Sequence, residues 1–145
     1  ELQGKIYPVG RLDKETSGLL LFTNDGVLAY RLTHPSFDHE KEYEVESNEE
    51  VKEGQLEKMR TGMMIKDEKT KPATVVKITS TKFTIALTEG KNRQIRRMCK
   101  KVGIPLIALK RTRIMTLKPQ LEKDGFRLLS EKEKVALLQS VNIEV

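Results

Sequence analysis

The chain has 145 residues, of which 37% are hydrophobic and 33% charged, and its 27 Lys and Arg against 21 Asp and Glu give a net charge of +6. This length predicts one domain with a substantial core, and the Leu, Ile, Val and Met that recur in every segment exclude a disordered chain. No apolar run approaches the about 20 residues of a membrane-spanning helix, and the single cysteine, Cys99, cannot form an internal disulfide. We therefore expect a soluble protein of the reducing cytoplasm, with no membrane partner.

The first predicted elements are a buried strand and a short helix. The continuous apolar run Gly18–Thr23 predicts the strand, and the polar segment between Gly10 and Gly18 predicts a loop before it. Asn24–Gly26 offers an N-cap for a helix that ends at His34.

A strand with one solvated face follows at residues 40–46, where Glu occupies every second position. Tyr43 therefore lies on the face away from the acids. A second helix is predicted from a cap at Asn48–Glu50 to Gly62. Three further strands are predicted at Met63–Lys66, Ala73–Thr79 and Phe83–Thr88.

The C-terminal half predicts two more helices and two strands. Asn92 begins a helix with an apolar stripe that includes Cys99, a core residue on this pattern, and Gly103 ends it. Strands are predicted at Leu106–Leu109 and Ile114–Leu117, and Ser130 begins a final helix with a capping box. Strands and helices do not alternate regularly, so the fold class is α+β, with a mixed, mostly antiparallel sheet flanked by helices, in a single domain over residues 1–145.

The positive charge is concentrated between Gly90 and Arg113. This segment holds nine Lys and Arg side chains and no carboxylate, and the rest of the chain is slightly acidic. Five of the nine are Arg, whose planar guanidinium suits phosphate, and unrelieved like charge destabilises a fold unless a polyanion binds to it. Nucleic acid is therefore the leading partner, although a run of charges is often only a solvated face.

One arginine of this segment differs from its neighbours. At 100° per residue Arg96 lies roughly 110° from the centre of the apolar stripe, at its shoulder, whereas Arg93 and Arg97 point outward. A half-buried guanidinium needs an anionic partner, and a carboxylate of the loop that contains Asp13 could supply it. Neither a phosphate-binding loop nor zinc spacing is present, so we predict no metal and no histidine-based triad.

Three segments also carry a resemblance that covers nearly the whole chain. They are Gly10-Arg-Leu-Asp-Lys-Glu-Thr-Ser-Gly-Leu-Leu-Leu, Lys41-Glu-Tyr43 and Gly90-Lys-Asn-Arg-Gln-Ile-Arg-Arg-Met98, in this order. Together they resemble the motifs of the ribosomal pseudouridine synthases of the RsuA/RluB/RluE/RluF type. The resemblance implies a pseudouridine-synthase-like fold and the isomerisation of a uridine in ribosomal RNA to pseudouridine, without metal or organic cofactor.

The resemblance also implies roles for individual residues. Asp13 would attack the flipped-out nucleotide at C1′ of the ribose or at C6 of the base, and Arg96 would keep its carboxylate ionised. Tyr43 would stack on the uracil, unless it is simply a core residue, and Leu109 would contact the other face of the base. Arg11 would approach the space that the base leaves. Phosphates would be held by Lys91, Arg93, Arg97, Lys100 and Lys101.

Three alternatives stay open at this stage. The chain could be a non-catalytic RNA-binding or ribosome-assembly module of the same fold, a synthase that acts on tRNA, or a metal-dependent nuclease using Asp13 and Glu15. Relatives of this type usually begin with a basic RNA-binding domain of the S4 type and a first strand of the catalytic sheet. We expect this chain to be a monomeric catalytic domain that lacks both.

Overall fold

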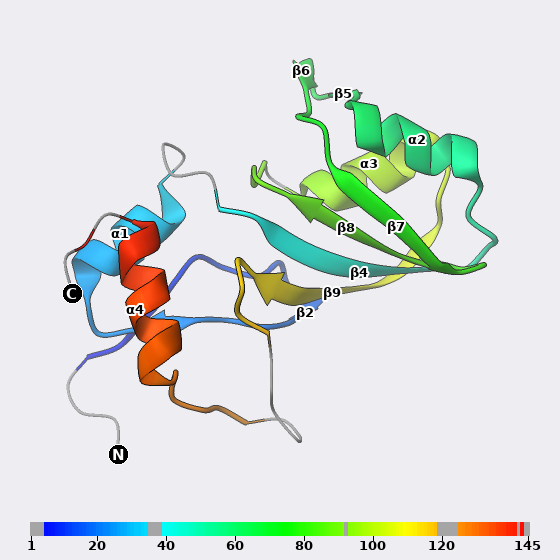
Figure 1. Ribbon diagram of the computed structural model, residues 1–145. Coiled ribbons are helices and arrows are strands. Elements are labelled where there is room, and N and C mark those ends of the chain that lie inside the picture. Colours follow the sequence, from blue (N-terminus) through cyan, green and yellow to red (C-terminus); the bar gives the residue numbers. More distant parts are fainter. Residues whose placement is uncertain (1–4, 35–38, 92, 119–124, 142, 144–145) are drawn as a thin grey trace.

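The computed structural model describes residues 5–34, 39–91, 93–118, 125–141 and 143, and Figure 1 shows their arrangement. In chain order the elements are β1 (Tyr7–Pro8), β2 (Thr16–Gly18), β3 (Phe22–Thr23), α1 (Gly26–Thr33), β4 (Lys41–Ser47), α2 (Glu53–Thr61), β5 (Met64–Ile65), β6 (Glu68–Lys69), β7 (Thr74–Thr79), β8 (Lys82–Leu87), α3 (Gln94–Val102), β9 (Leu106–Ile114) and α4 (Glu131–Ser140).

A five-stranded sheet in the order β2-β9-β4-β8-β7 forms the centre of the molecule. Strands β9, β4, β8 and β7 pair antiparallel, whereas β2 pairs parallel with β9 at the edge. Two short antiparallel pairs, β1-β3 and β5-β6, lie outside this sheet. The expected α+β fold with a mixed, mostly antiparallel sheet is confirmed.

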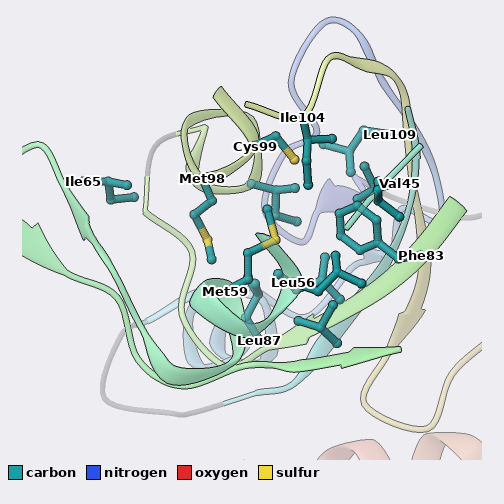
Figure 2. Packing of buried hydrophobic residues seen from close by; sticks show 14 residues of the cluster. Val45, Leu56, Met59, Ile65, Phe83, Leu87, Met98, Cys99, Ile104 and Leu109 are labelled. Atoms are coloured by element: carbon teal, nitrogen blue, oxygen red, sulfur yellow. The ribbon is translucent and has the colours of Figure 1, made fainter. Parts of the chain in front are cut away.

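The larger of two apolar cores lies where α2 and α3 cover one face of the sheet (Figure 1). Figure 2 shows Leu56 and Met59 of α2 and Met98 of α3 meeting Val45 and Phe83 of the strands. All five side chains are fully buried. Burying each contributes roughly 1.5–3 kcal/mol, so this core holds α3 firmly on the sheet.

A second core joins α1 and α4 at the other end of the molecule, where Figure 1 shows the two helices side by side. Leu28 and Leu32 of α1 meet Leu137 of α4 and the buried Val141 that follows it. The Arg31 guanidinium donates to the carbonyl of Val141 at 2.9 Å. Among the described residues, no helix combines the length and the apolar character needed to cross a bilayer.

The expected helix ends are largely confirmed. Asp25 caps α1 by accepting from the backbone N–H of two residues in its first turn, and His34 follows its last turn. Gly103 ends α3 in the left-handed conformation. Ser130 and Glu133 form the predicted capping box of α4. The expected start of α3 at Asn92 lies outside the described residues.

Two predictions of strands were wrong. The strand expected over Gly18–Thr23 is interrupted: β2 ends at Gly18, where a φ of +111° turns the chain, and β3 begins only at Phe22. The segment expected as a strand at Ile114–Leu117 is instead a turn, in which Met115 has a φ of +55° and Ile114 pairs with Leu117 in an isolated bridge. The strand expected at Leu106–Leu109 continues to Ile114 as β9, where Lys110 and Arg113 lie opposite Glu44 and Glu42 of β4. Cross-strand pairing with acids offsets the poor strand propensity of these cations.

The prediction for α2 was partly wrong, because the helix begins later than expected. Its N-cap is Lys52 rather than a residue of Asn48–Glu50, and Gln55 accepts from the Lys52 backbone N–H at 2.8 Å. Val51 is fully buried just before the helix. The expected end at Gly62 is confirmed. The β6 strand, which the sequence did not predict, pairs with β5 across a turn at Lys66 and Asp67, both in the left-handed region.

Candidate active site

An open cleft of about 610 Å³ lies between the N-terminal loop, the central strands and the start of α3. It contains residues from all three motifs identified in the sequence. Of the ten predicted site residues, seven line it: Arg11, Asp13, Tyr43, Lys91, Arg93, Arg96 and Leu109. The structure thus brings together side chains from segments that are about 30 to 80 positions apart along the chain.

The loop that holds Asp13 is fixed by β2, which the sequence analysis took for part of a loop. The backbone N–H of Thr16 donates to the Asp13 carbonyl at 2.9 Å, and β2 then pairs with β9. A Cβ on Gly18 would lie 2.2 Å from the carbonyl oxygen of Arg111, so only glycine allows this pairing. Asp13 is therefore positioned by the edge of the sheet and retains 38% side-chain exposure.

The start of α3 is fixed by a buried glutamine. Gln94, only 4% exposed, accepts from the Lys91 backbone N–H at 3.2 Å and donates to Glu89 at 2.8 Å. Arg93 is the N-cap in the left-handed conformation, with φ 50° and ψ 36°. This turn directs Arg93 toward the loop of Asp13 and Glu15.

The expected ion pair between Asp13 and Arg96 is not formed in this structure. Arg93 occupies the place of the partner, with its Nη1 4.0 Å from Asp13 Oδ2 and 3.3 Å from Glu15 Oε2. Arg96 lies one turn further along α3 and donates from Nη2 to Thr16 Oγ1 at 3.2 Å. The hydrogen bond from Arg93 holds the pKa of the Glu15 carboxyl below its usual value.

Four residues of the central strands form what we call the floor of the cleft: Lys41, Tyr43, Leu109 and Arg111. Tyr43 lies opposite Arg111 across the β4-β9 pair, and Leu109 precedes Arg111 by two positions. Tyr43 is half-buried, on the face predicted for it, while Leu109 is 5% exposed. The sequence analysis missed Lys41 and Arg111, although alternation from Tyr43 and Leu109 would have placed both on this face.

The cationic segment from Gly90 to Arg113 does not lie on one continuous surface. Some of its Lys and Arg side chains line the cleft, and the others lie on β9 or on α3 outside the cleft. Arg113 pairs with Glu40 at 2.6 Å, Lys91 pairs with Glu68 at 2.8 Å, and Lys101 donates to the carbonyl of Met64. Part of the positive charge is therefore neutralised within the chain.

Three predicted phosphate contacts, Arg97, Lys100 and Lys101, do not line the cleft. Lys100 and Lys101 are exposed at the C-terminal end of α3. Arg97 was expected to point outward and is instead half-buried.

Cys99 is 1% exposed and belongs to the larger core, as predicted, and its burial raises the pKa of the thiol to about 12. Such a thiol is a packing group rather than a nucleophile. Within the described part of the chain, no three His, Cys, Asp or Glu side chains are grouped closely enough to hold a metal ion.

Comparison with known proteins shows the family to which the chain belongs. Residues 1–101 match the family described as RNA pseudouridylate synthase. The chain belongs to this family. The matched segment contains all three motifs, and Asp13, Tyr43 and Arg96 fall within it.

Individual relatives agree with the family match. The chain is 41% identical over 113 residues to the dual-specificity RNA pseudouridine synthase RluF of Escherichia coli K12, covering 78% of this chain and 39% of that protein. It is 34% identical over 148 residues to the ribosomal large subunit pseudouridine synthase B of Pseudomonas aeruginosa, covering 97% of this chain and 38% of that protein. The chain thus spans about two fifths of the length of these two relatives.

A solved structure supports the fold at the level of coordinates. The crystal structure of a pseudouridylate synthase superimposes with a TM-score of 0.86 at 31% sequence identity. The match covers 92% of this chain and 60% of that one. The arrangement of the sheet and helices is therefore that of this pseudouridylate synthase structure.

Proposed function

We propose that this chain converts a uridine in ribosomal RNA to pseudouridine, with Asp13 as the nucleophile. The observation that carries the proposal is the cleft itself, which joins Asp13, Tyr43 and Arg96 from the three family motifs. A partly exposed carboxylate can reach a flipped-out nucleotide, while the loop that holds it stays fixed to the sheet.

The reaction balances without an external reactant. Asp13 attacks C1′ or C6 of the flipped-out nucleotide, and the bond between N1 and C1′ breaks with its electron pair remaining on the uracil. The base rotates, C5 bonds to C1′, the proton on C5 is lost, and N1 takes up a proton. The carboxylate is released unchanged.

The other residues of the cleft have supporting roles in this proposal. Tyr43 stacks on the uracil and takes part in the proton transfer at C5, and Leu109 contacts the opposite face of the base. Arg11 approaches the space that the base leaves in the RNA. Arg96 supports Asp13 through Thr16, which begins the strand that fixes the loop.

Cations around the cleft hold the RNA backbone. Lys91 and Arg93 line the cleft and would exchange their carboxylate partners for phosphates, whereas Lys100 and Lys101 extend the contact along α3. Arg97 would contribute beside them. These contacts give affinity rather than choice of sequence.

The test is the release of tritium from RNA labelled at C5 of uridine. The full chain, in excess over transcripts of small-subunit rRNA, large-subunit rRNA and tRNA, should release tritium from at least one rRNA transcript. Asp13→Asn should bind the same RNA with similar affinity and release none. Equal release by the two proteins would contradict the role of Asp13. Release from tRNA alone would show that the substrate is tRNA rather than ribosomal RNA. RNA binding without any release would favour a non-catalytic RNA-binding module.

A further inference from the structure

Two cations on the floor of the cleft have no carboxylate partner. Arg111 is only 3% exposed; its Nε donates to the Leu19 carbonyl at 2.8 Å, but its Nη2 is buried without a hydrogen-bond partner. Lys41 is half-buried, and among the described residues neither side chain forms an ion pair. Both residues line the cleft.

The strand register places both cations beside the proposed base-binding residues. Arg111 lies directly opposite Tyr43 across the β4-β9 pair, and Leu109 is its neighbour on the same face of β9. Lys41 precedes Tyr43 by two positions on β4 and lines the same cleft. A ring that contacts Tyr43 and Leu109 would therefore have both cations close to the Tyr43 end of the site.

Holding these two charges together is unfavourable for the free protein. Burial lowers the pKa of Lys41 below its usual value, and the nearby charge of Arg111 lowers it further. A buried, unpaired guanidinium is likewise costly. The hydrogen bond to the Leu19 carbonyl uses only one donor of the Arg111 guanidinium, and Arg111 is one of the residues that line the cleft.

We propose that Lys41 and Arg111 stabilise the negative charge that the uracil acquires when its glycosidic bond breaks. This inference rests on the proposed function. The electron pair of the N1–C1′ bond stays on the base and is shared by its carbonyl oxygens O2 and O4 until C5 bonds to C1′. Because the neutral uridine lacks this charge, the two cations act mainly on the rate rather than on RNA binding.

A phosphate is the competing occupant of such a site. A phosphodiester group is charged before the reaction as well as during it, so cations that hold it contribute to affinity and to its salt dependence. The depth of Arg111 and its position opposite Tyr43 favour the base. The two occupants are separated by measuring rate and affinity independently.

The experiment measures the single-turnover rate of tritium release at saturating RNA, together with the RNA dissociation constant, for the full chain and its variants. Lys41→Met and Arg111→Gln should each lower the saturating rate about 10²–10³-fold, the typical cost of removing one donor to a developing negative charge. The dissociation constant should change by less than about threefold, and Arg111→Lys should recover part of the rate. Lys110→Gln is the matched control, because this exposed neighbour on β9 faces the other side of the sheet.

Each other outcome has a distinct meaning. Weaker binding with an unchanged saturating rate would overturn the assignment in favour of a phosphate contact, and unchanged rate and binding would overturn it altogether. If Arg111→Gln fails to fold, as judged by its melting temperature, Lys41→Met decides the question. If the unmodified chain releases no tritium, the proposed function itself is refuted. This outcome differs from a failure of the role assigned to Lys41 and Arg111, in which the unmodified chain is active.

Discussion

Two pairs of cations in the cleft have opposite surroundings. At the rim, Lys91 and Arg93 each face carboxylates: Lys91 faces Glu68, and Arg93 faces Glu15 and, at a longer distance, Asp13. On the floor, the charges of Lys41 and Arg111 are partly or fully buried and have no such partner. One Lys and one Arg of the cleft are thus paired with carboxylates, whereas another Lys and another Arg of the same cleft are not.

This difference suggests a division of labour. The cations of the rim are partly exposed and already paired with carboxylates. When an RNA phosphate replaces such a carboxylate, the net gain in binding energy is only the difference between the two ion pairs. The floor is less accessible to water, where a fixed positive charge acts more strongly on any group that becomes negative. Rim residues should therefore govern RNA binding, and floor residues the chemical step.

The largest expected effect comes from disturbing the backbone contact between β2, which fixes the loop of Asp13, and the floor strand β9. Gly18→Ala puts a Cβ against the backbone of Arg111 at a position with φ +111°, so it should lower the free energy of unfolding by roughly 2–4 kcal/mol and the melting temperature by about 10 °C. Thermal denaturation measures this loss. Gly54→Ala, in α2 with open space around it, should be neutral or stabilising, and equal melting temperatures of the two variants would contradict the account.

An intermediate effect is expected from the Lys91–Glu68 pair of the rim. Glu68→Gln should tighten RNA binding by up to about fivefold, because Lys91 is then left with one carboxylate partner, Glu89, instead of two. Lys91→Gln should weaken binding and reduce the salt slope by about 0.7. Titration of labelled RNA at several salt concentrations measures both. Glu131→Gln removes the same charge from α4; an equal gain in affinity there would reduce the effect to net charge alone.

The smallest effect concerns a partly exposed ion pair outside the cleft, between Arg127 and Glu133. The hydrogen bond from Arg127 lowers the pKa of Glu133 from 4.5 to about 2, so the stability that this group contributes is present above pH 4.5 and lost as the pH falls toward 2. Glu133→Gln should therefore be less stable than the natural chain at pH 6, with a smaller difference at pH 3 and none below about pH 2. Urea unfolding at the two pH values tests this, and a difference independent of pH would contradict it.

Local signals in the sequence located the helices and most of the site. Asp25, Gly103 and Ser130 act through their own backbone neighbours, so their caps could be predicted. Tyr43 could be placed on the cleft face because strand alternation is also local. The resemblance to the family motifs then indicated Asp13 as the candidate nucleophile.

What the sequence could not show depends on contacts between distant segments. β2 exists because Gly18 lets it pair with β9 about 90 positions later, and the continuity of β9 depends on acids in β4. The choice of Arg93 rather than Arg96 as the neighbour of Asp13 follows from one left-handed residue at the N-cap. Arg111 belongs to a run of cationic residues, and residue type alone predicts that such residues are exposed to solvent.

The most direct test of the division between rim and floor is the dependence of the single-turnover rate on RNA concentration for two matched variants, Lys91→Gln and Lys41→Met. Each removes one lysine charge from the cleft. The account predicts that Lys91→Gln mainly raises the RNA concentration needed for half the maximal rate, and that Lys41→Met mainly lowers the maximal rate itself. The reverse pattern, or the same pattern for both variants, would contradict it.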